Sequence, residues 1–219
     1  MEQLKFLLDL FLHLDEYMAN IISQYGAWTY AILFLVIFME TGFVVTPFLP
    51  GDSLLFAAGS FAALGSMNVW LLIVLLIVAA IGGDTVNYWV GHYMGDRAYN
   101  VKWIKREYLD RTHAFFEKHG GKTIFLARFV PIVRTFAPFV AGMGRMSYGY
   151  FISYNVFGGI VWVVLFTLLG YFFGNIPFVK KNFELVILAI IFISVLPAVW
   201  EAWKARHEMK MEKAEAKTP

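Results

Sequence analysis

The stretch PFLPGDSLLFAAG, residues 47–59, places two prolines, two glycines and an aspartate inside a segment that is otherwise strongly apolar. Proline lacks a backbone donor and disfavours helix in the residue before it, so an apolar helix that reaches Pro47 cannot continue smoothly past Pro50. The flanking apolar runs, residues 27–39 and 53–64, would form helices of only about 20 Å and 18 Å. Because the hydrocarbon core of a bilayer is about 30 Å thick, we predict a re-entrant helical hairpin that enters and leaves on one side.

The composition of the whole chain is that of an integral membrane protein. Of its 219 residues, 59% are hydrophobic and only 16% are charged, whereas about 25% of residues are charged in soluble domains. Three runs contain no Asp, Glu, Lys or Arg, namely residues 17–39, 53–83 and 146–179. The chain has no cysteine, and its five histidines show no metal-ligand spacing. We therefore expect no metal, no cofactor and no nucleic-acid partner.

A second interrupted segment, FLARFVPIVRTFAPFVAG at residues 125–142, has the same design, with Pro131 and Pro138 as its interruptions. Beyond the interruptions the two halves of the chain match at an offset of 79 residues. At this offset GHYMGD (91–96) lies over GYFFGN (170–175). The match indicates an internal repeat.

Each repeat then consists of a hairpin followed by one spanning helix, predicted at residues 69–94 in the first half and 149–174 in the second. One crossing per repeat places the halves in opposite orientations, as in inverted-repeat transporters whose discontinuous helices meet near the midplane. The predicted fold is all-α, with an amphipathic N-terminal helix before the repeats and a C-terminal transmembrane helix at about 183–203. The alternative is a plain bundle of five or six spans with proline kinks.

The charge distribution predicts the orientation. The 95–122 loop, Arg145 and the residues from Lys204 onward together carry 13 Lys and Arg, against three on the other side. The positive-inside rule makes the richer side cytoplasmic, and the sequence leaves the side of the N-terminus open. The expected organisation is one membrane domain over 1–204, with repeat 1 at about 25–96 and repeat 2 at about 119–175, followed by a cytoplasmic tail over 205–219.

Four ionisable side chains lie in or beside the two interruptions: Glu40 and Asp52 in the first, Arg128 and Arg134 in the second. An isolated charge at the bilayer centre costs about 2.5–3.5 kcal/mol on insertion scales, so these groups must be paired or hydrated. Hairpins that enter from opposite faces and meet would bring the four together around a cavity. Guanidinium groups suit bidentate capture of a phosphate or carboxylate, and carboxylates in such a cavity are candidates for proton coupling.

Simpler interpretations of these residues stay open. The four charges can be salt bridges that only hold the hairpins together, and Asp52 can serve as an N-cap for the following helix. Four further polar side chains are candidates for lining the cavity: Ser53, Asp84, Asn87 and Thr135. For Asp84 and Asn87 the alternative is helix packing. The tryptophans, Trp162 among them, are interpreted as interface anchors, and the glycines as sites of close helix contact.

Two longer stretches carry a family resemblance. METGFVVTPFLPGDSLLFAAG (39–59) and KHGGKTIFLARFVPIVRTFAPFVAGMGRMS (118–147) resemble the bacterial DedA family of the wider SNARE-associated or VTT-domain group, over about residues 20–180. The resemblance implies inner-membrane proteins with paired re-entrant hairpins that return the lipid carrier undecaprenyl phosphate across the membrane with the proton-motive force. The family's important acids match Glu40 and Asp52, and its important arginines match Arg128 and Arg134.

The predicted function is therefore that of a lipid flippase in the bacterial inner membrane. The resemblance implies that the chain recycles undecaprenyl phosphate, and we expect Glu40 and Asp52 to couple to protons and Arg128 and Arg134 to bind the phosphate. The expected partners are a polyprenyl phosphate lipid, protons and membrane lipids, and the oligomeric state is open, a homo-oligomer included. The alternatives are a proton-coupled transporter of ions or small solutes and a protein of proton homeostasis.

One further pattern points to a different class. GDSL at 51–54 and DRTH at 110–113 superficially resemble two blocks of GDSL hydrolases. Such a triad needs Ser53, Asp110 and His113 within hydrogen-bond reach of one another. Because Ser53 lies in an apolar hairpin and the other two lie in a basic cytoplasmic segment, we do not expect an enzyme.

Overall fold

The computed structural model describes residues 14–43, 51–98, 120–129 and 131–182, and beyond them 185, 186 and 188–190. This part of the chain consists of helices and turns without strands, as the all-α prediction requires. Several predicted features lie outside the described residues: the N-terminal amphipathic helix, the tip of the first hairpin, most of the basic loop, most of the last helix and the tail.

Eight helical elements have their bounds within the described residues. They are α2 (Leu14–Tyr25), η1 (Gly26–Trp28), α3 (Thr29–Gly42), α4 (Gly51–Ala63), α5 (Val69–Ala98), α7 (Pro131–Met143), α8 (Tyr148–Phe173) and α9 (Pro177–Lys181). Residues 120–127, before α7, are also helical. The first interrupted helix ends at Gly42 and not at residue 39 as predicted, because the helical hydrogen bonding continues to the cap at Phe43, whose amide donates to the Met39 carbonyl.

Three stretches are long and apolar enough to cross a membrane: Tyr17–Gly42, Val69–Gly95 and Tyr148–Phe173. The first is not one regular helix, since Gly26 adopts a φ of 51° in the short η1 turn between α2 and α3. With 14 residues, α3 by itself is about 21 Å long. The other two spans lie within one residue of the predicted bounds, 69–94 and 149–174, at each end.

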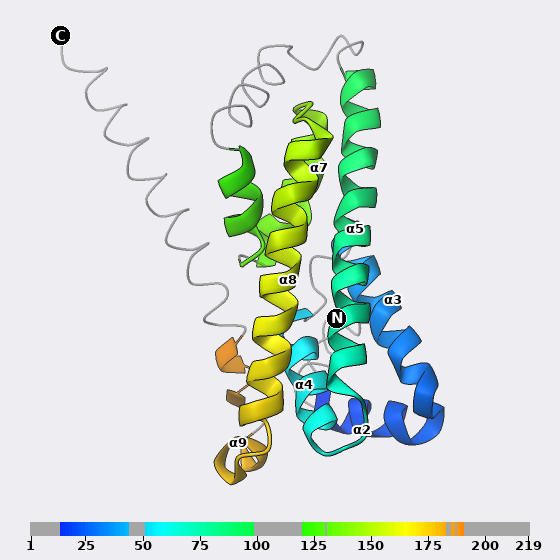
Figure 1. Cartoon of the computed structure of the whole chain (residues 1–219), viewed down its shortest axis with the longest axis vertical. Helices are drawn as coiled ribbons and strands as arrows, with labels where there is room; N and C mark the ends of the chain where they lie inside the picture. Colours follow the sequence, from blue (N-terminus) through cyan, green and yellow to red (C-terminus); the bar gives the residue numbers. More distant parts are fainter. Residues whose placement is uncertain are drawn as a thin grey trace, which may run out of the picture.

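The helices of the two halves run in opposite directions (Figure 1). α5 and α8 lie along the long axis, with the α4–α5 turn at the lower end and the α7–α8 turn at the upper end. The last turn of α3 and the first turn of α4 lie near the middle of the molecule. The interrupted ends of these helices are therefore far from the two turns.

Glycines allow the helices to cross closely. A Cβ atom on Gly170 of α8 would overlap the Phe56 carbonyl of α4, and one on Gly91 of α5 would overlap the Phe139 carbonyl of α7. The two glycines differ by 79 residues, the offset of the sequence repeat. The predicted role of glycine in close helix contact is confirmed at these crossings.

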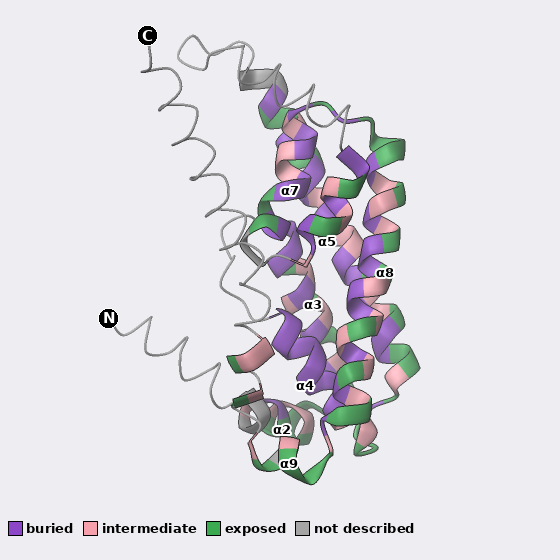
Figure 2. Ribbon diagram, turned by 90° about the vertical axis from the view of Figure 1, so that its left-hand side faces the viewer, coloured by how far each residue is buried: buried purple, intermediate pink, exposed green. Residues whose placement is uncertain are grey.

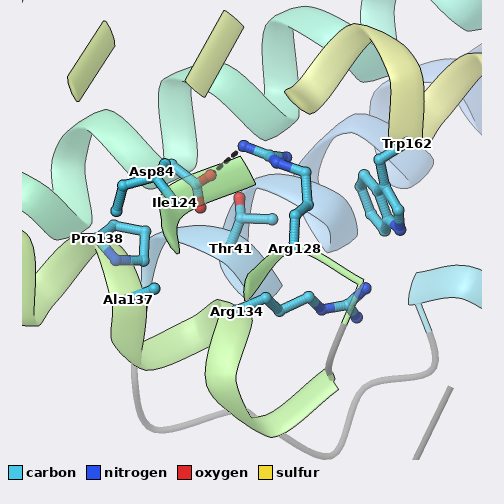
Figure 3. A pocket seen from close by; sticks show the side chains of 8 residues that line it. All are labelled: Thr41, Asp84, Ile124, Arg128, Arg134, Ala137, Pro138 and Trp162. Carbon is cyan, nitrogen blue, oxygen red and sulfur yellow. Dashed lines mark hydrogen bonds and ion pairs between the residues drawn. The ribbon is translucent and has the colours of Figure 1, made fainter. Parts of the chain in front are cut away.

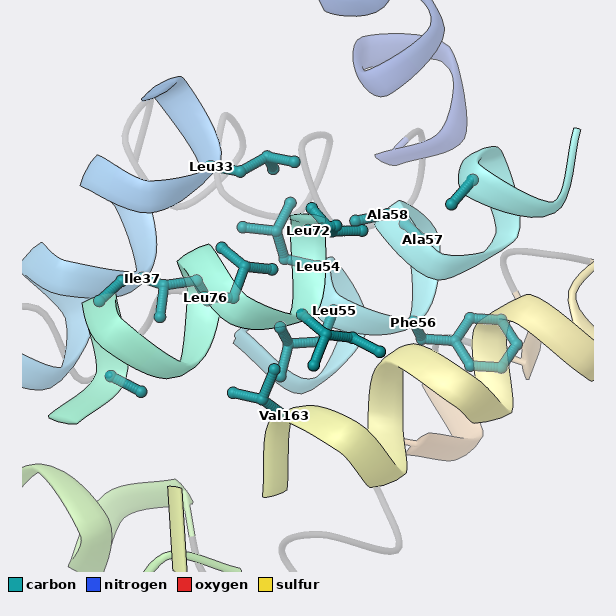
Figure 4. Close-up of a cluster of buried hydrophobic side chains, with 14 of the residues drawn as sticks. Leu33, Ile37, Leu54, Leu55, Phe56, Ala57, Ala58, Leu72, Leu76 and Val163 are labelled. Carbon is teal, nitrogen blue, oxygen red and sulfur yellow. The ribbon is translucent and has the colours of Figure 1, made fainter. Parts of the chain in front are cut away.

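The apolar core lies between α3, α4, α5 and α8. It includes Leu33, Ile37, Leu55, Leu76 and Val163, which meet as shown in Figure 4. All of α4 from residue 51 to 60 is buried, and Figure 2 shows this helix enclosed by its neighbours. Since a helix buried on every side cannot send its polar groups to water, those at its start need partners within the protein.

Candidate functional site

The interrupted ends of α3 and α4 bring two carboxylates together. Glu40 lies in the last turn of α3, and Asp52 lies in the first turn of α4. The amide of Gly51 donates to Glu40 Oε1 over 3.2 Å. The start of α4, where an anion is favoured, is therefore occupied by a carboxylate of the chain itself. A Cβ atom on Gly51 would overlap this carboxylate, which explains the glycine after Pro50.

Arg134 of α7 joins these two acids. Its Nη1 donates to Asp52 Oδ1 over 2.7 Å, and its Nη2 bonds Glu40 Oε1. All three side chains are buried. One guanidinium thus links α3, α4 and α7 through two separate carboxylates, which is the fork geometry that arginine offers and lysine lacks.

Arg128 has different partners. Its Nη2 pairs with Asp84 Oδ2 of α5 and also donates to Asn155 Oδ1 of α8. The described structure gives it no ion pair with Glu40 or Asp52, so the predicted group of four is divided into two clusters. From the sequence, Asp84 is predicted only as a candidate for lining the cavity. The sequence does contain a feature that indicates this ion pair. Asp84 follows a long charge-free run, so its carboxylate needs a counterion within the membrane.

Trp162 contacts residues of both clusters. Its Nε1 donates to Asp52 Oδ1 over 2.7 Å. The centre of its ring is 4.9 Å from Cζ of Arg134 and 5.9 Å from Cζ of Arg128, within the range of cation–π attraction. Its interpretation as an interface anchor is wrong, because this side chain is 0% exposed. By contrast Trp28 and Trp70 are 73% and 70% exposed, as an anchor requires.

A small cavity remains between the clusters (Figure 3). Its volume is about 10 Å³, which is the lower limit for one ordered water molecule. It is lined by Thr41, Asp84, Ile124, Arg128, Arg134, Ala137, Pro138 and Trp162. Of the residues that the sequence suggested for lining, Asp84 faces this cavity, whereas Ser53, Asn87 and Thr135 are buried without lining it.

Asn87 joins the two interrupted regions from α5. Its Nδ2 donates to the carbonyl of Thr41 over 3.1 Å and to the carbonyl of Thr135 over 2.7 Å. The Thr41 carbonyl belongs to the last turn of α3, where helical partners run out. A side-chain amide therefore satisfies backbone groups of α3 and α7 at once, which favours the packing interpretation of this residue.

The charges of the site do not balance if every group is ionised. Glu40, Asp52 and Asp84 carry three negative charges against two positive charges on Arg128 and Arg134. Among the described residues no group of His, Asp and Glu side chains forms a metal site. Burial of this cluster is tolerable only because each guanidinium is directly paired, so an entering anion has to compete with a carboxylate.

Comparison with known proteins identifies the family. The model of the VTT domain matches residues 49–172, which contain Asp52, both arginines and Trp162. Protein DedA of Escherichia coli K12 is 56% identical over 219 residues, covering 98% of this chain and 99% of the relative. This chain belongs to the DedA family. The resemblance seen in the sequence is therefore confirmed.

Other DedA-family relatives are named as membrane proteins. An uncharacterized membrane protein of Mycobacterium leprae is 43% identical over 84% of this chain and 85% of its own length. Inner membrane protein YqjA of E. coli K12 is 34% identical over 78% of this chain and 79% of its own length. No solved structure matches the chain significantly. Together with the three apolar helices, these names make the chain a membrane protein.

Proposed function

We propose that this DedA-family chain is a proton-coupled lipid transporter that returns undecaprenyl phosphate across the bacterial inner membrane. The observation that carries the proposal is the pair of buried guanidiniums, Arg128 and Arg134, beside one cavity between apolar helices. Guanidinium groups bind phosphate oxygens through paired hydrogen bonds, and a buried basic site in a membrane protein calls for an anionic ligand or a counterion. The inner-membrane location is supported by the name of the relative YqjA.

The proposed architecture is an inverted repeat of two re-entrant hairpins, each followed by a spanning helix, in one membrane domain. Two features support it. The α4–α5 and α7–α8 turns lie at opposite ends of the molecule (Figure 1). The crossing glycines Gly91 and Gly170, like Gly95 and Gly174, differ by the repeat offset of 79 residues. In this arrangement the basic loop and the C-terminal tail are cytoplasmic.

In the proposed transport step only the headgroup crosses the protein, while the polyprenyl tail stays in the bilayer. A cavity of about 10 Å³ is too small for a phosphate group, so the structure corresponds to a closed state that opens to admit it. A proton on Glu40 or Asp52 makes the site less negative and favours the phosphate. Loss of that proton restores the carboxylate and favours release, so a proton gradient gives the transport a direction.

Reconstitution tests this proposal directly. The purified chain is placed in liposomes that contain polyprenyl phosphate, and the appearance of the phosphate group on the opposite face is followed with a membrane-impermeant reagent. We expect transport by the wild-type chain and background rates for the Arg128→Ala/Arg134→Ala double variant. Arg145→Ala, which changes an exposed arginine, is the matched control and should retain transport.

Two outcomes would contradict the lipid assignment. Equal rates for the wild-type chain and the double variant would exclude a role of the buried arginines in lipid movement. Proton flux that depends on Glu40 and Asp52 without lipid movement would instead favour the ion or small-solute alternative. Asp110 and His113 of the hydrolase pattern lie outside the described residues, and we do not propose hydrolysis.

A further inference from the structure

The two buried arginines differ in how firmly their charge is neutralised. Arg134 is bound by two carboxylates, those of Glu40 and Asp52, whereas Arg128 is bound by one carboxylate and one side-chain amide. An incoming anion must displace a carboxylate to gain a buried guanidinium, and each such pair is costly to break when nothing replaces it. Displacement of one carboxylate from Arg128 is therefore easier than displacement of two from Arg134.

The two arginines also differ in whether their carboxylate partners line the cavity. Both guanidinium side chains line it, but Asp84 is its one lining carboxylate within the described structure (Figure 3). Glu40 and Asp52 do not line it. An anion that enters this space therefore meets the ion pair of Arg128 and Asp84 directly.

Arg128 would keep its position after Asp84 leaves. Asn155 accepts from Arg128 Nη2 through Oδ1, and its own Nδ2 donates to the Ile81 carbonyl over 3.2 Å. The amide is thus fixed between α5 and α8. A donor held in place before the ligand arrives loses less conformational entropy on binding.

Arg134 also lines the cavity, and its guanidinium has one donor that no acceptor in the described part of the chain uses. Its Nη1 and Nη2 are used by Asp52 and Glu40, while its Nε is buried without an acceptor among the described residues. Buried donors without acceptors are rare in proteins, and they often mark a place that a ligand or a water molecule occupies. A phosphate oxygen next to Arg128 is the kind of acceptor that this Nε lacks.

We infer that Arg128 and Asp84 form an exchange pair, in which a phosphate monoester replaces the Asp84 carboxylate on Arg128. Arg134 remains bound to Glu40 and Asp52 and adds its Nε as a second donor. The inference rests on the proposed function, because the phosphate monoester is the headgroup of the transported lipid. It assigns Asp84 the role of a competitor that occupies the site when the lipid is absent and expels the phosphate on its return.

The test is the binding of phosphate ligands to the full-length Asp84→Asn variant in detergent micelles. The substitution removes the competing charge and keeps the side-chain size. We expect the dissociation constant for polyprenyl phosphate to fall by at least about tenfold. Transport in liposomes should slow, because the bound phosphate is no longer expelled. Unchanged or weaker binding by this variant would overturn the exchange pair.

Two matched variants separate exchange from a general effect of charge. Asp84→Glu keeps the competing carboxylate and should bind no more tightly than the wild-type chain; tighter binding would overturn the inference. The tighter binding of phosphate ligands by Asp84→Asn should be absent in Asp84→Asn/Arg128→Gln. If the tighter binding persists in this double variant, the inference is overturned. This double variant has no unpaired charge in the pair, so it stays informative if the single variant fails to fold. It should bind no phosphate ligand, and binding by it contradicts the exchange pair.

The lipid and the free anion are distinguished by separate titrations with polyprenyl phosphate and inorganic phosphate. Arg128-dependent binding of either one by Asp84→Asn supports the exchange pair, and binding of inorganic phosphate alone removes the lipid from the assignment. The proposed function fails separately, if the wild-type chain moves no polyprenyl phosphate in liposomes. If the wild-type chain transports lipid and Asp84→Asn binds it with unchanged affinity, only the exchange pair is wrong.

Discussion

At the scale of single residues, the Asp52 carboxylate is the acceptor on which two helices converge. Its Oδ1 accepts from Arg134 Nη1 and from Trp162 Nε1, each over 2.7 Å. Trp162→Phe keeps an aromatic ring beside the arginines and removes the second donor. We expect the free energy of unfolding in detergent to fall by about 1.5–3 kcal/mol, as for other hydrogen bonds to charged groups. Trp28→Phe, at a side chain that is 73% exposed, should change it by no more than about 0.5 kcal/mol. Equal stabilities of the two variants would show that the indole donor contributes nothing.

Arg134 provides a second prediction at this scale. The Arg134→Lys variant keeps the charge, but a single ammonium group cannot reproduce two bonds from different nitrogens to Glu40 and Asp52. We expect transport to fall to the level of Arg134→Ala, measured in the same liposome assay. Arg145→Lys at an exposed position should transport normally. Transport by Arg134→Lys at the wild-type rate would mean that the fork geometry is not required.

The sequence predicted part of this residue-level arrangement. Glu40, Asp52 and Arg134 could be brought together because charges in apolar hairpins must find partners. The partner of Arg128 could not be predicted, because Asp84 and Asn155 reach it from two spanning helices whose relative rotation depends on side-chain packing. The burial of Trp162 could not be predicted for the same reason, since an apolar helix pattern does not show which face turns toward a buried charge.

At the scale of helices, the neighbouring glycines Gly82 and Gly83 of α5 differ in how much space a side chain would have. A Cβ atom on Gly83 would overlap Thr41 Oγ1 and lie 2.7 Å from the Phe38 carbonyl, whereas one on Gly82 would lie 3.5 Å from the Phe38 ring. Gly83→Ala must therefore push α3 away from α5, and overpacking of this kind costs about 1–3 kcal/mol. Gly82→Ala should be neutral or slightly stabilising, because alanine favours helix. Thermal unfolding in detergent compares the two, and equal midpoints would contradict the close α3–α5 contact.

The turns after α4 and α7 have the same backbone design. In each, an amide donates to a carbonyl five residues earlier, Ser66 to Phe61 over 3.3 Å and Met146 to Ala141 over 3.0 Å. The residue before each of these amides is left-handed, Gly65 at φ 81° and Arg145 at φ 56°. This is the usual end of a helix in which glycine is preferred.

A substitution at Gly65 therefore tests the cost of the left-handed backbone conformation without any side-chain clash. A Cβ atom on it meets nothing within 4 Å, so Gly65→Ala should destabilise by about 1–2 kcal/mol through its left-handed conformation. Gly149 also has free space around it, but it lies in α8 without a positive φ. Gly149→Ala should stabilise by about 0.5–1 kcal/mol. Unfolding free energies in detergent measure both, and effects of the same sign would be inconsistent with this account.

At the scale of the whole molecule, the sequence predicted the spanning helices well and the interrupted ones less well. α5 and α8 follow from long apolar runs, whose length alone decides that they can cross a bilayer. The predicted helix stops three residues before the observed end of α3, because the charge-free apolar run ends before Glu40. In the structure the Glu40 carboxylate is paired and the Thr41 hydroxyl donates to the Ile37 carbonyl over 3.0 Å, so the helix continues.

The orientation of the two halves in the membrane is the last prediction, and the chain suits its test because it contains no cysteine. Ser66 and Arg145 are exposed in the α4–α5 and α7–α8 turns, which lie at opposite ends of the molecule (Figure 1). We expect Ser66→Cys to react with a membrane-impermeant maleimide in intact spheroplasts, and Arg145→Cys to react only after the membrane is opened. The basic loop and tail fix this direction through the positive-inside rule. Reaction of both cysteines from the same side would exclude the inverted repeat, since a helix pair with both turns on one face cannot be related by an axis in the membrane plane.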